Sequence, residues 1–162
     1  MAVLWLIPVA ALCGRMLCEQ HQRYALKQYP IVSMRGTFFD ANRERAAMLT
    51  AFLQHVRGGT LVVIPEGVTL DYLAGATTPL TYHTFTPVEI DDPRVELPIL
   101  REISDKPPDR IAIVDRDVRE FGYRGFGIDY GLHLAKWISA HYRREAQMRG
   151  SRFWMVVLRR AR

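Results

Sequence analysis

Charged side chains follow two short apolar runs of the sequence, and these are positions where chemistry could take place. Residues 60–64 (TLVVI) are followed by Pro65-Glu66-Gly67, and residues 110–114 (RIAIV) are followed by Asp115-Arg116-Asp117. Short β-branched runs bounded by Gly or Pro are typical of strands buried on both faces. Ligands of open parallel sheets bind at the carboxyl ends of strands. If the two strands are neighbours, Glu66 and the 115–117 loop therefore share one rim.

The carboxylates of this rim allow more than one interpretation. Glu66 could act as a general base or contact a ligand, or it could cap the amides of the turn after Pro65. Asp115 and Asp117 could hold a divalent cation, because hard cations prefer carboxylate oxygens, or they could pair with arginines. The D-x-D pattern is short and unspecific, so we predict no metal and no cofactor. The candidate ligand-binding residues are Glu66, Asp71, Tyr82, Arg116, Asp117, Asp129 and Tyr130.

An aromatic and arginine-containing loop, residues 121–126 (FGYRGF), lies between Asp117 and Asp129. Its rings and its guanidinium could stack on sugars or bases. The other interpretation is that the aromatic side chains pack on the core of their own domain.

The elements that must position these residues alternate between helix and strand. We predict strands at residues 31–39, 60–64, 110–114 and 152–158, and helical segments at 41–56 (N-capped by Asp40), 68–73, 98–104 and 129–145. The segments 76–93 and 115–127 are rich in Thr, Pro or Gly and predict loops. Alternation of this kind indicates a parallel sheet with helices on both faces. The expected fold is a small α/β, Rossmann-like sandwich with a mostly parallel sheet of about four strands.

The N-terminal segment differs in composition from the rest of the chain. Residues 1–14 carry no charge, and Arg15 is the first charged residue. A helix of this length spans about 21 Å, less than the roughly 30 Å of a bilayer core. A signal peptide would need a positive segment before the apolar run, and a buried amphipathic helix would need polar residues at helical spacing. We therefore expect residues 1–23 to be the C-terminal part of a transmembrane helix with a juxtamembrane linker, and Met1 to be internal to a longer protein. Residues 24–162 form the soluble α/β domain.

Positive charge is concentrated at the C-terminal end. Residues 142–162 contain seven arginines and one acidic residue, Glu145. Such a segment could bind nucleic acid, attract anionic lipid head groups, or simply be solvated. Few aromatic residues are interleaved with the arginines, so we predict a membrane-lipid partner and no nucleic acid.

Several motifs occur in an order that resembles one family. The segments are 63–67 (VIPEG), 70–73 (LDYL), 78–82 (TPLTY), 107–111 (PPDRI), 116–122 (RDVREFG) and 126–131 (FGIDYG). They resemble "VVPEG…LNYL…PT.Y" and "PPD.I.LVHRDTSEYG…FFG.DYG", patterns of the C-terminal soluble domain of bacterial polytopic membrane proteins. Those proteins are similar to lipid-linked-sugar glycosyltransferases of the dolichyl-phosphate-mannose protein mannosyltransferase class. The chain has Asp71 where the family pattern has asparagine and Asp115 where it has histidine, which weakens the metal interpretation.

The resemblance implies a function for the whole chain. It would be the terminal membrane helix and extracytoplasmic domain of a glycosyltransferase-like protein of the inner (plasma) membrane, on the periplasmic side. The catalytic carboxylates of that family lie in the membrane part, so no residue of this chain is predicted to be catalytic. The domain would assist binding of a glycan acceptor or a lipid-phosphate sugar. The alternatives are a small stand-alone enzyme acting on sugars through Glu66 and Asp117, and a membrane-tethered interaction module.

Overall fold

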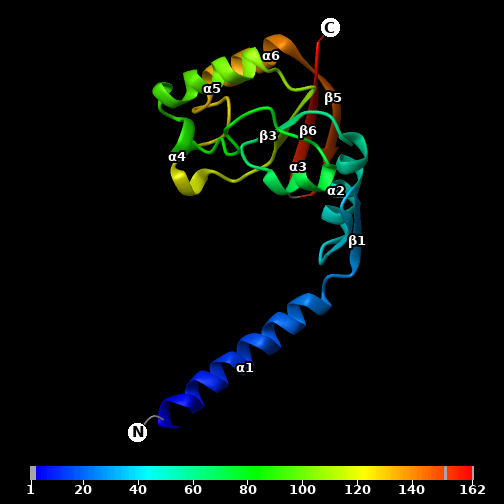
Figure 1. Ribbon diagram of the computed structural model, residues 1–162, viewed down its shortest axis with the longest axis vertical. Coiled ribbons are helices and arrows are strands. Elements are labelled where there is room, and N and C mark those ends of the chain that lie inside the picture. The colour runs from blue at the N-terminus through cyan, green and yellow to red at the C-terminus, as the bar shows by residue number, and fades with distance from the viewer. Residues whose placement is uncertain (1–2, 152, 162) are drawn as a thin grey trace.

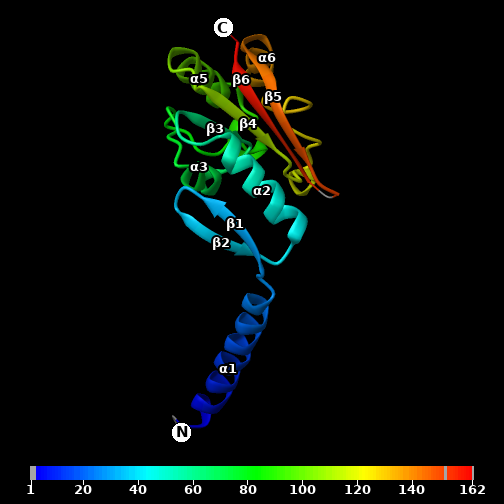
Figure 2. The ribbon, with the colours of Figure 1, turned by 90° about the vertical axis from the view of Figure 1, so that its right-hand side faces the viewer.

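A long N-terminal helix, α1 (Val3–Ala25), extends away from the rest of the chain (Figures 1 and 2). The computed structural model describes residues 3–151 and 153–161. Across those residues, no helix has both the length and the apolar character needed to cross a membrane. The prediction that the fold begins with part of a transmembrane helix is therefore contradicted. The physical reason is that the uncharged stretch stops at Gly14, whereas the same helix continues through Arg15, Glu19 and Arg23.

A hairpin follows α1 where the sequence predicted one strand over residues 31–39. Strands β1 (Tyr29–Ser33) and β2 (Gly36–Asp40) pair antiparallel as a two-stranded sheet. The chain reverses because Gly36 has φ +124°, a conformation that glycine adopts easily and other residues rarely adopt. Ser33 supports the turn: its hydroxyl donates to the carbonyl of Gly36 (2.8 Å) and accepts from the amide of Arg35 (3.1 Å).

Helix α2 (Arg43–His55) follows the hairpin and begins two residues later than predicted. Its N-cap is Asn42, whose side chain accepts the amide of Arg45 at 2.9 Å. The predicted cap, Asp40, instead accepts the amide of Asn42 (2.7 Å) and forms an ion pair with the Arg45 guanidinium (2.6 Å). The helix buries Ala46, Met48, Phe52 and Leu53.

The main sheet has four strands in the order β3, β4, β6, β5. Strands β3 (Leu61–Ile64) and β4 (Arg110–Val114) match the two predicted buried strands and pair parallel. Strand β6 (Trp154–Arg160) pairs antiparallel with both β4 and β5 (Tyr142–Arg149). The sheet is mixed and mostly antiparallel, so the predicted Rossmann-like, mostly parallel arrangement is wrong, although the α/β class holds.

The error in topology arises at residues 142–149. The sequence predicted one helix over 129–145, but helix α6 (Leu132–His141) ends before Tyr142 and β5 begins there. Residues such as Arg, Glu, Gln, Ala and Met favour helices, yet pairing with the next strand overrides this preference. Because a short turn joins β5 to β6, the two strands must be antiparallel.

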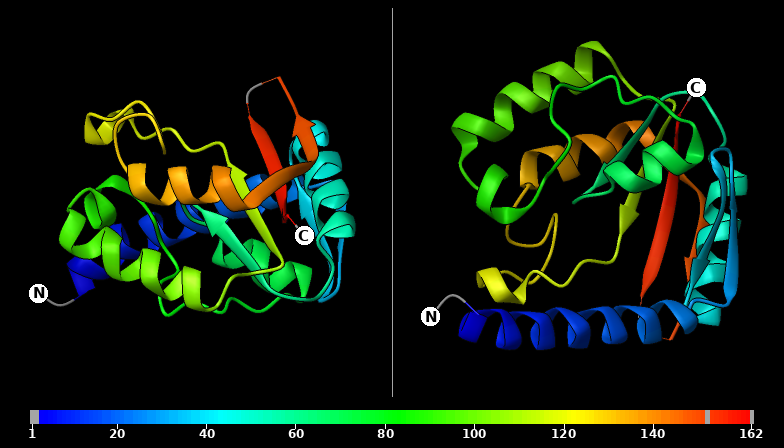
Figure 3. Two further views of the ribbon diagram at one scale, coloured as in Figure 1. Left: turned by 90° about the horizontal axis from the view of Figure 1, so that it is seen from above. Right: turned by 60° about the horizontal axis from the view of Figure 1, so that its bottom comes forward.

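Helices cover both faces of the main sheet (Figure 3). Along β3, Leu61 and Val63 belong to a core that includes α2 and α3 (Val68–Ala74), whereas Val62 and Ile64 belong to a second core. The second core includes side chains of α4 (Pro87–Ile90), α5 (Pro93–Asp105) and α6. Helix α5 is longer than the predicted 98–104 because Asp92 caps it and Pro93 occupies its first turn. A short 3₁₀ turn, η1 (Arg119–Phe121), lies in the loop after β4.

Candidate functional site

The carboxyl ends of β3 and β4 form one rim, because the two strands are neighbours, which is the condition on which the prediction depended. The parallel register pairs Ile64 with Ile113, so the segments that follow the two strands leave the sheet side by side. Arg116 from the second segment reaches Glu66 of the first: its Nε donates to Glu66 Oε1 at 2.9 Å. Two residues 50 positions apart in the sequence are thus joined at this edge. We call the surface formed by residues 66, 115–120 and 124–130 the strand-end rim.

Arg116 is the centre of the polar contacts on the strand-end rim. Besides Glu66, its Nη2 donates to Glu120 Oε1 (2.7 Å) and its Nη1 donates to the carbonyl of Asp117 (3.1 Å). The side chains of Arg116, Glu66 and Glu120 are 36%, 45% and 56% exposed. Ion pairs with this exposure contribute little to folding. The cluster is therefore available to contact a ligand without being needed to hold the domain together.

Asp117 is occupied by its neighbour Arg119. The carboxylate accepts hydrogen bonds from the Arg119 side chain (2.9 and 2.7 Å) and from its amide (3.0 Å), which caps η1. These bonds, the side-chain ones first, lower the pKa of Asp117 to about 2. Asp117 is thus a permanent anion at neutral pH. Within residues 3–151 and 153–161, no three His, Cys, Asp or Glu side chains are grouped so that they could hold a metal ion.

Asp129 orders the loop that closes the strand-end rim. Its carboxylate accepts the amides of Arg124 (2.8 Å) and Gly125 (3.1 Å) and the Nε of Arg124 (3.3 Å). Burial acts to raise the pKa of Asp129, but these hydrogen bonds outweigh it and the pKa is lowered. The predicted ligand-binding residue is thus engaged in fixing the turn before Tyr130.

Tyr130 is a buried candidate residue with unused hydrogen-bonding capacity. It is only 2% exposed, and its ring packs edge-on against Tyr123 and Phe126 (centroid distances 5.6 and 5.9 Å). Tyr123 and Phe126 of the 121–126 loop therefore pack on the core, whereas Phe121 is 38% exposed. Among the described residues the Tyr130 hydroxyl has no hydrogen-bond partner. Burial, then the charge of Asp129, raises the pKa of Tyr130 to about 12, so the hydroxyl keeps its proton.

Two open hollows lie beside the segment 124–130. One of about 390 Å³ is lined by Asp115, Arg116, Asp117, Val118, Arg119, Arg124 and Phe153. A smaller one of about 100 Å³ is lined by residues that include Asp91, Asp129, Tyr130 and His133. The larger hollow offers three guanidiniums and two carboxylates. Such a lining can both donate to and accept from the hydroxyl groups of a polar ligand and can bind its anionic groups.

Two predicted residues lie outside this network. Tyr82 is 39% exposed, in a loop that reaches the rim because Thr84 pairs with Glu66 as a β-bridge. Asp71 lies on α3, and its buried Oδ1 has no hydrogen-bond partner among the described residues. Burial raises the pKa of Asp71 to about 7. Throughout the described residues, no hydrogen bond joins either side chain to Glu66 or Arg116.

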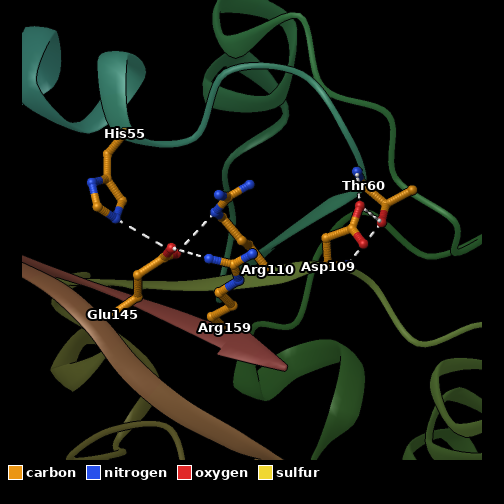
Figure 4. Close-up of polar contacts among 6 residues, drawn as sticks. All are labelled: His55, Thr60, Asp109, Arg110, Glu145 and Arg159. Atoms are coloured by element: carbon orange, nitrogen blue, oxygen red, sulfur yellow. Dashed lines mark hydrogen bonds and ion pairs between the residues drawn. The ribbon is translucent and has the colours of Figure 1, made fainter. Parts of the chain in front are cut away.

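Three polar residues of the strand-end rim are not among the predicted ligand-binding residues. Glu120, Arg119 and Arg124 take part in its contacts, and all three lie in the segment that follows a buried strand. A second cluster lies at the other end of the strands, around Glu145 (Figure 4). It was not predicted because residues 142–145 were assigned to the end of a helix, whereas residues 142–149 form β5 and pair with β6.

The fold and the rim define an α/β domain with a mixed sheet and an open, polar surface at the ends of its two parallel strands. No family model, curated protein or solved structure matches this chain. The resemblance of its motifs to the glycosyltransferase-like membrane proteins therefore stays a prediction.

Proposed function

We propose that this chain is a non-catalytic accessory domain of a lipid-linked-sugar glycosyltransferase-like membrane protein. In this proposal the domain lies on the extracytoplasmic side and binds the glycan acceptor or the lipid-phosphate sugar at the strand-end rim. The observation that carries the proposal is that two motifs of the resemblance make contact there, through Arg116 and Glu66, and that the charges of both act on Tyr130 of a third motif. Residues 63–67 supply Glu66, residues 116–122 supply Arg116, and residues 126–131 supply Asp129 and Tyr130.

The chemistry of the rim supports a sugar-phosphate or glycan ligand. Guanidiniums bind phosphate oxygens through paired N–H donors, and carboxylates accept hydrogen bonds from sugar hydroxyls. Arg116, Arg119 and Arg124 line the larger hollow together with Asp115 and Asp117. Because these ion pairs are exposed, a ligand can replace one partner at little cost to the fold.

The protonation states favour binding over acid–base catalysis. A general acid or base works best with a pKa near the operating pH. Asp117, with a pKa of about 2, is far below that range, and Glu66 is paired with Arg116. Asp71 has a suitable pKa, but its carboxyl group is largely buried and lies outside the network of the rim. These points weigh against the stand-alone enzyme acting through Glu66 and Asp117.

The test is binding of a defined probe by the 1–162 chain. We would titrate a short-chain prenyl-phosphate mannose, the same prenyl phosphate without sugar, and a mannose oligosaccharide, and follow the binding by calorimetry. Arg116→Gln removes the central cation of the rim, so we expect binding to weaken at least about tenfold. The control is Arg101→Gln, an exposed arginine of α5 outside the rim. Absence of saturable binding of all three probes, or equal weakening by both variants, would contradict the proposal.

A further inference from the structure

Three arginines gather around an open hollow at the end of the main sheet opposite to the strand-end rim. The hollow has a volume of about 490 Å³ and is lined by Asp109, Arg110, Arg159, Arg160 and Ala161. The register of the sheet explains the gathering: Arg110, the first residue of β4, is directly opposite Arg159 of β6. We call this set of residues the arginine hollow.

Two like charges facing each other across adjacent strands repel, so this arrangement needs an anion. Glu145 of β5 supplies one (Figure 4). Its Oε2 accepts from Arg110 Nε at 2.9 Å, and its Oε1 lies 3.4 Å from Arg159 Nη1. Burial acts to raise the pKa of Glu145, but the bond from Arg110 and the surrounding cations lower it, so the carboxylate stays ionised.

The second carboxylate of the hollow, Asp109, adds negative charge near Arg110 and Arg159 but forms no ion pair with either in the described part of the chain. Asp109 points toward Thr60, and its Oδ2 accepts from the Thr60 amide (3.0 Å) and hydroxyl (2.9 Å) (Figure 4). Arg160 forms no ion pair with any residue of the described part of the chain, and Arg110 and Arg159 each donate a single side-chain hydrogen bond to Glu145. Most of the guanidinium N–H groups around the hollow are therefore free to donate to a further anion.

We propose that the arginine hollow binds the phosphate or diphosphate group of a phosphate ester. Arg159 would supply forked donors beside Arg110, which Glu145 holds, and Arg160, the next residue of β6, would supply a third positive charge from the other side of the strand end. Guanidiniums match phosphate oxygens in geometry, and charge-assisted hydrogen bonds of this kind are the strong ones. A volume of about 490 Å³ accommodates a phosphate with part of the group it esterifies. This site is separate from the strand-end rim, and only the choice of a soluble ester over a lipid rests on the proposed function.

Under the proposed function, in which α1 leads toward the membrane, the position of the site favours a soluble ester over a lipid head group. The C-terminal end of β6, which carries Arg159 and Arg160, lies at the end of the molecule opposite α1 (Figures 1 and 2). Phosphate chemistry is common to both sources, so the test includes a probe for each.

We would titrate inorganic pyrophosphate into the 1–162 chain by calorimetry at low salt. Arg159→Gln and Arg160→Gln each remove one guanidinium, and each should weaken pyrophosphate binding at least about tenfold. Arg149→Gln is the matched control, because Arg149 is an exposed arginine of β5 and does not line the hollow. The affinity of the Arg149→Gln variant for pyrophosphate should stay within about twofold of that of the original chain.

A second arm measures co-sedimentation with vesicles of phosphatidylglycerol and of phosphatidylcholine. We expect neither vesicle to compete with pyrophosphate for the hollow. Competition by phosphatidylglycerol vesicles that is lost in Arg160→Gln would overturn the soluble-ester assignment and identify a lipid head group as the ligand. No saturable pyrophosphate binding, or equal weakening in all three variants, would overturn the site itself.

Discussion

Asp71 differs from the other acidic candidates because its carboxyl group is largely buried and lacks a counter-ion. Asp117 and Asp129 each accept several hydrogen bonds, and both have lowered pKa values. Asp71 has a buried Oδ1 without a partner in the described residues, and burial raises its pKa to about 7. The fold thus raises the pKa of Asp71 and lowers the pKa of Asp117 and Asp129, a difference that the sequence does not display.

The pKa of Asp71 predicts a pH dependence of stability. An unfolded aspartate has a pKa of about 3.9, so from that pH up to about 7 the folded state holds the extra proton. Stability therefore falls as the pH rises through this window, because the folded state binds more protons than the unfolded state. Asp71→Asn should flatten the decrease of Tm between pH 5 and pH 8 and raise Tm at pH 8.

Thermal unfolding followed by circular dichroism at several pH values checks this prediction. Asp105→Asn, an exposed aspartate at the end of α5, removes the same charge and should leave the pH profile unchanged. A profile of Asp71→Asn that parallels that of the original chain would show that Asp71 is ionised in the folded state throughout.

At the scale of the elements, the buried strands were the most predictable part. Residues 60–64 and 110–114 are apolar and largely β-branched, and they form the adjacent parallel strands β3 and β4 of the main sheet. The pattern did not establish that the two strands are neighbours; their parallel pairing, and with it the Glu66–Arg116 contact, comes from the structure. Strand β5 was not predictable from its residues, because YRREAQMR favours a helix by composition and becomes a strand only through its pairing with β6. The Tyr130 hydroxyl and the arginine hollow also depend on tertiary packing, which the sequence does not display.

Tyr142 fixes the point at which α6 changes into β5. It is buried, and its hydroxyl donates to the carbonyl of Pro108 at 2.7 Å, just before β4. Tyr142→Phe leaves this buried carbonyl without its partner, so we expect a loss of about 1–3 kcal/mol in the free energy of unfolding. Urea unfolding measures the loss. Tyr82→Phe is the control and should change stability little, because Tyr82 is 39% exposed. Equal stability of the two variants would mean that the Pro108 contact contributes nothing to the fold.

At the scale of the whole molecule, the proposed extracytoplasmic location can be tested without knowing the ligand. The free cysteines that the structure describes, Cys13 and Cys18, both lie on α1. In a variant with both changed to serine, His83→Cys places one thiol in the exposed loop before α4. We expect a membrane-impermeant maleimide to label this thiol in intact cells.

The same variant without His83→Cys should show no labelling, and lysed cells should show full labelling of the His83→Cys chain. Labelling only after lysis would place the domain on the cytoplasmic side and would contradict the location, although the ligand-binding proposals would be unaffected.

The two outer strands of the main sheet have a consequence for self-association. An open strand edge is a template on which another chain can add a strand and start aggregation. Beside β3, the segment after α3 forms bridges from Thr77 to Thr60 and from Thr84 to Glu66, which cover that edge. On the other side, β5 exposes Arg143, Arg144 and Arg149 along its length. If β5 paired with β5 of a second copy, arginines of one copy would face arginines of the other and repel them. The positive charge of the C-terminal segment therefore also opposes edge-to-edge growth of the sheet into a fibre.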